Sequence, residues 1–151
     1  MWCSDPPHRR RRIGRVLILL VALWFGQAAR AQGVVLVSAR AGGIPELDRE
    51  TAAQLYLGRR TSLPDGRSAR LLDLPAGPER DLFYERLTAK NPSQIRAYWS
   101  RMVFTGRAHP PHEANDQEDA LRRVLTDPSA LAYLPAASVV GQPLNVLLRL
   151  E

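Results

Sequence analysis

Cysteine is nearly absent from this sequence: the only one among 151 residues is Cys3, close to the start. It precedes an apolar run, so the 120 residues after Ala31 can form no disulfide, no thiolate metal site and no cysteine nucleophile. A lipoprotein leader would need its cysteine at the end of that run, so a lipid anchor there is excluded as well. A packed apolar core must therefore stabilise the fold, and a chain of this size can supply one.

Catalytic and nucleotide-binding motifs are also missing. The sequence contains no G-x-x-x-x-G-K-[ST], no G-x-G-x-x-G and no G-x-S-x-G. A Ser–His–Asp arrangement would depend on His109 and His112, because the third histidine, His8, lies before the apolar run. We therefore predict no cofactor and no enzymatic activity, and a hydrolase that uses the His109/His112 loop is the minor alternative.

The whole sequence has a formal net charge of +6, and most of this positive charge lies in the first part of the chain. Residues 1–31 hold six arginines and one aspartate, whereas residues 32–151 hold fifteen basic and fourteen acidic groups. A nucleic-acid-binding domain should keep its positive charge in the folded part. The nearly neutral second part therefore argues against a nucleic acid as partner.

The first 31 residues have the three-part order of a secretory signal peptide. Arginines 9–12 form a positive start, residues 16–25 (VLILLVALWF) an apolar run, and Ala29 and Ala31 an A-x-A-like cleavage site. We predict a signal peptide over 1–31, cleavage between Ala31 and Gln32, and a periplasmic location. Spanning a bilayer takes about 20 apolar residues, and this run has half that length. An uncleaved leader is the alternative, and it is the only route by which we expect contact with a membrane.

Apolar runs and turn residues predict an alternation of strands and helices. The expected strands are Gly33–Ser38, Ala69–Leu74, Leu131–Leu134 and Leu144–Leu150. Helices are expected from Asp48 to Gly58, over roughly Glu79–Ala89, from Asn91–Pro92 onward, and from Asn115 or Asp116 to Asp127–Pro128, with a loop over Gly106–Glu113. The first strand is apolar on both faces, which is typical of a parallel or mixed sheet. Together the elements indicate a layered α/β fold.

Three of these helices show an apolar stripe that we expect to face the core. The predicted inward residues are Leu82, Phe83 and Leu87 in the second helix, Ile95, Tyr98, Trp99 and Met102 in the third, and Leu121, Val124 and Leu125 in the last.

The string His109–Pro110–Pro111–His112–Glu113 has the composition of a metal site. Two prolines favour an extended polyproline conformation, which separates the histidines by about 9 Å at ~3.1 Å per residue. Two ligands that each lie about 2.0–2.1 Å from one zinc ion cannot be so far apart. We therefore predict a solvated loop and no metal.

Three stretches resemble the substrate-binding proteins of phosphate-type ABC transporters. They are ETAAQLYLGRRTSLPDGRSARLLDLP (Glu50–Pro75), FYERLTAKNPSQIRAYWSRMVFTGRAHPP (Phe83–Pro111) and DPSALAYLPAASV (Asp127–Val139). They are similar to that family's "FLGK"-like helix end and its later "NPGAIGY"-like turn and strand. The YWSR–FTG–PP segment is similar to that of small, leader-bearing, single-lobe relatives. The resemblance implies a single lobe of a type 2 periplasmic-binding-protein-like fold over 32–151, with a mixed sheet flanked by helices.

The resemblance also implies a binding site for an anion, and the residues of this sequence at that site differ from those of the family. Family members have two lobes and hold an oxyanion on Ser/Thr hydroxyls and backbone N–H groups at the start of a helix. The matching stretch is Pro75–Glu79, which we call the phosphate seat. Pro78 has no N–H to donate, and Glu79 places a carboxylate where the helix dipole would favour phosphate. We therefore expect the phosphate seat to be degenerate.

Four other residues are candidates for binding a ligand. Arg101, Thr105 and Arg107 follow the Tyr98–Trp99 face at the end of a predicted helix, and guanidinium groups pair well with oxyanions. Ser38 ends the first strand, where open α/β sheets bind ligands. The structural alternative is that Arg101 is a surface helix residue and Ser38 the polar end of a strand.

These observations predict an exported, non-enzymatic anion-binding or sensing accessory protein. Its expected ligand is a small oxyanion, and its expected partner an inner-membrane permease or a sensor kinase. The alternative is a periplasmic protein-interaction module without a small-molecule ligand. In that case the face that would meet a second lobe meets a partner or a second copy instead.

Overall fold

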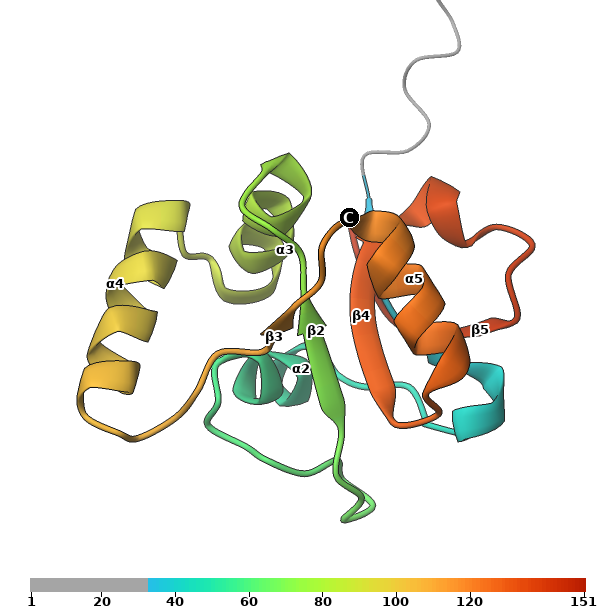
Figure 1. Ribbon diagram of the computed structural model, residues 1–151, viewed down its shortest axis with the longest axis horizontal. Helices are drawn as coiled ribbons and strands as arrows, with labels where there is room; N and C mark the ends of the chain where they lie inside the picture. The colour runs from blue at the N-terminus through green and yellow to red at the C-terminus, as the bar shows by residue number, and fades with distance from the viewer. Residues whose placement is uncertain (1–32) are drawn as a thin grey trace, which may run out of the picture. The chain divides into compact units, whose positions relative to one another are not determined.

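The strands form one mixed sheet, which confirms the predicted fold class. The computed structural model describes residues 33–151, so the predicted leader, Cys3 and the cleavage site lie outside it. The strands are β1 (Val34–Ala39), β2 (Arg70–Asp73), β3 (His112–Glu113), β4 (Ala130–Pro135) and β5 (Leu144–Leu150). Their order is β3-β2-β4-β1-β5 (Figure 1). β2 runs parallel to β3 and β4, whereas β1 runs antiparallel to β4 and β5.

Side-chain caps define where most of the helices begin. The helices are α2 (Arg49–Tyr56), α3 (Pro78–Thr88), α4 (Pro92–Phe104) and α5 (Gln117–Thr126), with 3-10 turns η1 (Arg40–Gly42) and η2 (Ala136–Val139). Asp48 and Asp116 accept backbone N–H groups at the starts of α2 and α5, and Asn91 forms a capping box with Gln94 at the start of α4. Within residues 33–151, no helix combines the length and the apolar character needed to span a bilayer.

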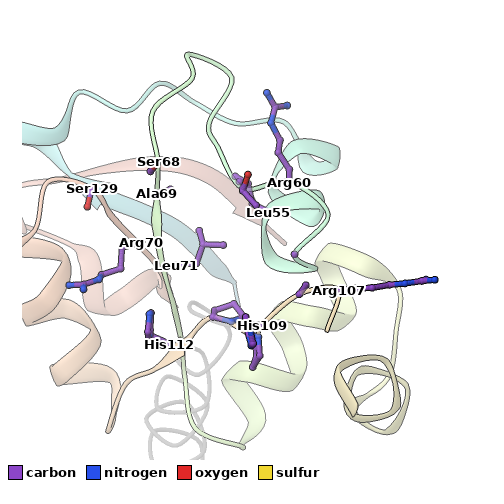
Figure 2. Close-up of a pocket in the computed structure, with 15 residues that line it drawn as sticks. Leu55, Arg60, Ser68, Ala69, Arg70, Leu71, Arg107, His109, His112 and Ser129 are labelled. Carbon is purple, nitrogen blue, oxygen red and sulfur yellow. The ribbon is translucent and has the colours of Figure 1, made fainter. Parts of the chain in front are cut away.

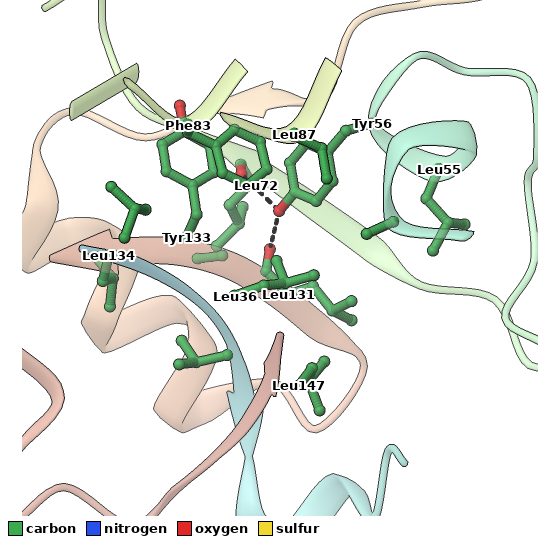
Figure 3. Close-up of a cluster of buried hydrophobic side chains, with 14 of the residues drawn as sticks. Leu36, Leu55, Tyr56, Leu72, Phe83, Leu87, Leu131, Tyr133, Leu134 and Leu147 are labelled. Carbon is green, nitrogen blue, oxygen red and sulfur yellow. Dashed lines mark hydrogen bonds between the residues drawn. The ribbon is translucent and has the colours of Figure 1, made fainter. Parts of the chain in front are cut away.

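Helices cover both faces of the central strands. α5 packs on β1 and β4, and α3 packs on β1, β4 and β5, which leaves every residue of β1 buried. The core beside α3 is aromatic: the rings of Phe83 and Tyr133 stack with centroids 3.7 Å apart. The hydroxyl of Tyr56 donates toward the carbonyl oxygens of Leu72 and Leu131 at 3.2 and 3.3 Å (Figure 3). This cluster joins α2 and α3 to the middle of the sheet.

Three local predictions are wrong or incomplete. The expected loop over Gly106–Glu113 ends in a short strand, β3, because the backbone of residues 112 and 113 pairs with β2. Leu125 is 36% exposed rather than inward, since Ala120 and Val124 occupy the buried side of α5. On α3 the buried aromatic partner of Phe83 is Tyr84, while Leu82 is only partly buried. Trp99 is buried, as predicted, at 7% exposure.

The sheet has two distinct ends. At the end that we call the carboxyl end, β2, β3 and β4 finish and β1 begins, and the phosphate seat follows β2 directly. At the opposite end, the amino end, β2 and β4 begin and β1 finishes; Ser38 pairs with Leu131, which pairs with Leu71. In Figure 1 the carboxyl end is uppermost, beside the C-terminus.

Candidate functional site

The phosphate seat at the carboxyl end already holds a carboxylate. Gly77 is the N-cap of α3 and offers no side-chain cap, and Pro78 occupies the first turn. Glu79 also lies in this first turn, and its Oε2 is 3.9 Å from the point where a Cβ on Gly77 would stand. The carboxylate therefore lies close to the helix start, where the dipole would otherwise attract an anion.

Further carboxylates lie in the first turns of the two helices, α3 and α5, that begin at this end of the sheet. Asp81 shares the first turn of α3, and Glu118 and Asp119 share the first turn of α5. Asp119 is buried and pairs with Arg123 at 2.8 Å and with Arg122. The backbone N–H of Asn115, together with these arginines, lowers the pKa of Asp119. Asp81 and Glu118 form no ion pair with any of residues 33–151, so their negative charges would oppose a phosphate that approaches this end of the sheet.

A buried network anchors the junction between β2 and α3. Asp73 ends β2, and its carboxylate accepts from the hydroxyl of Tyr133, from the hydroxyl of Tyr84 at 3.2 Å and from Nε of Arg80 at 3.1 Å. The Tyr133 oxygen in turn accepts the backbone N–H of Leu74 at 2.9 Å. Every member has a partner, so the network fixes the entry to α3 without leaving a group free for chemistry.

Burial dominates the titration of this network. Desolvation raises the pKa of Asp73 above its ordinary value, although hydrogen bonds from Tyr133, Arg80 and Tyr84 oppose the rise. Desolvation, together with the neighbouring Asp73, also raises the pKa of Tyr84 and that of Tyr133. Sequence reasoning missed this network. The available signal was Asp73 at the end of an expected strand. Its position there does not indicate which residues it contacts.

The amino end carries a wide cavity, which we call the arginine hollow. Its volume is about 610 Å³, and it is lined by Leu55, Gly58, Arg60, Thr61, residues 68–71, residues 107–112 and Ser129. These residues come from the end of α2, the start of β2, the α4–β3 connection and the turn before β4. Figure 2 shows Arg70 and Arg107 extending in opposite directions, with Leu71 between them.

Positive charge in the arginine hollow is poorly balanced. Arg60, Arg70 and Arg107 line the hollow, and no aspartate or glutamate does. Nε of Arg60 donates to the Ser62 carbonyl at 2.8 Å, and the Arg70 guanidinium lies 3.4 Å from Asp127, which is outside the lining. Arg107 is exposed and forms no ion pair with any of residues 33–151. The hollow therefore presents an excess of guanidinium groups to solvent.

One wall of the arginine hollow depends on a glycine. Gly58 follows α2 with φ +64°, the left-handed conformation expected of a residue that ends a helix. A Cβ at this position would stand 2.8 Å from Cβ of Ala108 and 3.2 Å from Cη2 of Trp99. The indole of Trp99 thus packs directly behind the wall of the hollow.

His109 and His112 both line the arginine hollow as exposed residues. His112 belongs to β3, and His109 lies in the connection before it. Across residues 33–151, no group of three or more His, Cys, Asp or Glu side chains is arranged to hold a metal ion. The two imidazoles add polar ring surface to a cavity that arginines, apolar groups and the hydroxyl side chains of Thr61, Ser68 and Ser129 also line.

The structure distributes the four predicted ligand residues over different surroundings. Ser38 is fully buried inside β1, and its hydroxyl has no hydrogen-bond partner among residues 33–151. Arg101 borders a second cavity of about 310 Å³ with Arg59 and Lys90, whereas Arg107 lines the arginine hollow.

Thr105 caps the end of α4 by donating to the Arg101 carbonyl at 2.8 Å. A helix C-terminus attracts cations rather than anions. The four residues thus form no single pocket, and their ligand role stays a prediction.

Solved structures show what the fold resembles. No protein-family model matches the sequence, and no curated protein matches it either. One similar structure, from Clostridium perfringens, is described as a phosphate ABC transporter substrate-binding protein with bound phosphate; the TM-score is 0.58 at 14% identity. Another is an ABC-type phosphate transport receptor from Vibrio cholerae, with the same TM-score and identity.

The matches cover 76% of this chain but only 44% and 45% of those proteins, about half their length. The chain therefore has the fold of one lobe of a phosphate-binding protein, and both neighbours are named as binding or receptor proteins.

Proposed function

We propose that this chain is an exported, non-enzymatic anion-binding or sensing accessory protein whose phosphate seat is degenerate. The observation that carries the proposal is the arginine hollow, which three arginines and no carboxylate line and in which Arg107 has no ion-pair partner among residues 33–151. Guanidinium groups are the side chains best suited to pair with oxyanions. The lobe fold shared with phosphate transport proteins supports a binding role, and the expected partners are a permease or a sensor kinase of the inner membrane.

The phosphate seat should contribute little to anion binding. Two unit charges 4 Å apart repel by about 4 kcal/mol at an effective dielectric constant of 20, which is the scale of the penalty that Glu79 imposes on a phosphate. Pro78 removes one backbone donor from the same helix start. A single lobe cannot enclose the ion to offset these losses. We expect phosphate to bind more weakly than a dissociation constant of roughly 100 μM.

Calorimetric titration with inorganic phosphate tests this reading of the seat. The full-length protein should show only weak binding, and the double variant Pro78→Ser, Glu79→Gly should bind phosphate more tightly. Glu85→Gln removes one exposed carboxylate elsewhere on α3 and serves as the control for net charge. Micromolar phosphate affinity in the unchanged protein would contradict the proposed degeneracy. Neighbouring genes for a permease and an ATPase would support transport, and a histidine kinase gene would support sensing.

A protein-interaction module is the second candidate, and one observation favours it. Phe104 ends α4 with 92% of its surface exposed, beside Val103 at 49%. Aromatic anchors flanked by arginine are typical of protein interfaces, and Arg101 and Arg107 lie nearby in sequence. Size-exclusion chromatography with light scattering tests self-association. A dimer that Phe104→Ser converts to a monomer would support this alternative, and a monomer at all concentrations would remove the second copy as the partner.

A further inference from the structure

The arginine hollow is too large for an inorganic oxyanion alone. Its volume is about 610 Å³, whereas a phosphate ion has only five heavy atoms. The value lies within the range of about 300–1,000 Å³ in which proteins bind organic ligands. A bare phosphate would leave most of this space to water.

Apolar groups occupy part of the lining between the charged ones. Leu55, Leu71 and Ala69 come from α2 and the start of β2, and Pro110 and Pro111 come from the connection between α4 and β3. Arg70 and Leu71 leave β2 on opposite sides of the strand, and Leu71 lies on the side where Arg107 is found (Figure 2). Organic-ligand sites have this composition, with a mostly apolar surface and a few polar groups that fix orientation.

We propose that the arginine hollow binds an organic oxyanion, whose apolar or aromatic body lies on Leu71 and the two prolines while its sulfonate, phosphate-ester or carboxylate group pairs with Arg70 or Arg107. This inference rests on the proposed anion-binding function and names its ligand class. Arg107 is free to turn inward because it forms no ion pair with residues 33–151, and Arg70 gives up only an exposed contact with Asp127. The site lies at the end of the sheet opposite the phosphate seat.

Three probes separate the charge of the ligand from its apolar body. The first, 8-anilinonaphthalene-1-sulfonate, carries both an aromatic body and an anion, and its fluorescence rises on binding. The second, N-phenyl-1-naphthylamine, has the same rings without the charge, and the third, inorganic sulfate, has charge without rings. We expect the sulfonate dye to bind full-length protein with a dissociation constant on the order of tens of micromolar. The neutral dye should bind at least about tenfold more weakly, because it cannot form a charged hydrogen bond.

Matched variants locate the dye. Arg70→Gln, Arg107→Gln should weaken binding of the sulfonate dye at least about tenfold. Arg96→Gln, Arg149→Gln removes the same charge from exposed residues outside the hollow and should leave dye affinity unchanged. Phe104→Ser should also leave it unchanged, since Phe104 does not line the hollow. Circular dichroism melting checks that each variant folds.

Two results would overturn the proposal: equal dye affinity in the Arg70/Arg107 variant and the unchanged protein, or equal affinity for the charged and neutral dyes. Calorimetry with sulfate distinguishes this failure from that of the proposed function. If sulfate binds and loses affinity in the Arg70/Arg107 variant while the dye does not, the protein binds inorganic anions and only the ligand class is wrong. If neither sulfate nor dye depends on these arginines, both proposals are wrong.

Discussion

Carboxylates lie at the carboxyl end of the sheet and arginines line the hollow at the amino end, and the two sets of charges have different partners. At the carboxyl end, Asp73 is satisfied by Tyr84, Tyr133 and Arg80, and Glu79 lies against the start of α3. At the amino end, Arg70 makes one exposed carboxylate contact at 3.4 Å, Arg60 donates to the Ser62 carbonyl, and Arg107 is exposed without an ion pair to residues 33–151. Charges with internal partners contribute to stability, whereas charges that face solvent are available to a ligand.

The contrast between the two ends indicates where a binding site can lie in a shared fold. Open α/β sheets bind ligands beyond the carboxyl ends of their strands, which is the end that this chain fills with carboxylates. Because function belongs to a site and not to a fold, the same lobe can present a different binding surface elsewhere. Substitutions at the two ends should therefore separate stability from binding.

The largest effect should come from the residue that supports the hollow wall. Trp99→Ala removes a side chain that is 93% buried and that packs behind Gly58, so we expect a loss of about 3–5 kcal/mol in the free energy of unfolding. Urea denaturation measures it, with the exposed Ser100→Ala on the same helix as the control. A loss below about 1 kcal/mol would mean that the indole is not part of the core.

A smaller effect should follow from neutralising the network at the carboxyl end. Asp73→Asn keeps the shape of the side chain but leaves one acceptor oxygen where the carboxylate serves Tyr133, Tyr84 and Arg80. Hydrogen bonds to charged groups contribute about 1.5–3 kcal/mol, which sets the expected loss at pH 7. Glu85→Gln, an exposed change on α3, should lie within about 0.5 kcal/mol of the unchanged protein. Equal stability of the two variants would show that the network is not needed.

The pH dependence of the same substitution gives a finer test. Burial raises the pKa of Asp73 above its ordinary value of 3.8, so the folded state binds the proton more tightly than the unfolded state. The resulting stabilisation is complete below pH 3.8 and is lost as the pH rises through the folded-state pKa. The loss caused by Asp73→Asn should therefore be larger at pH 4 than at pH 7. A loss that grows with pH would mean that the pKa of Asp73 is lowered in the folded state, and that hydrogen bonding outweighs burial.

Local signals explain what the sequence predicted well. The last strand was predicted with both of its bounds, Leu144–Leu150, because an apolar run between polar turns marks a strand. The helices expected from Asp48 and from Asn91 begin there because short polar side chains cap the backbone N–H groups of a helix start. The resemblance supplied the lobe architecture, which periodicity alone does not give.

Features that depend on distant residues were not predictable in the same way. β3 was missed because two residues after Pro110–Pro111 carry no strand pattern, and only pairing with β2 orders them. The partners of Asp73 lie 7 to 60 positions away, so its strand position gave no indication of a network. The arginine hollow combines four separate stretches, and of its arginines only Arg107 was among the predicted ligand residues.

The smallest change in stability should come from replacing an arginine of the hollow at the amino end. The Arg70 side chain is 61% exposed, and its guanidinium nitrogen lies 3.4 Å from Asp127, so the pair is a surface ion pair. Such pairs contribute about 0.2–1 kcal/mol, and salt screens them because the Debye length falls to about 3 Å at 1 M. We expect Arg70→Gln to lower the free energy of unfolding in urea by less than about 0.5 kcal/mol in 0.15 M salt, and by less still in 1 M salt. Asp127→Asn, which removes the other partner, is the matched variant, although it also alters the two hydrogen bonds that the Asp127 carboxylate accepts from Ser129. A loss above about 1.5 kcal/mol that persists in 1 M salt would mean that the fold depends on Arg70, and that this guanidinium is not free for a ligand.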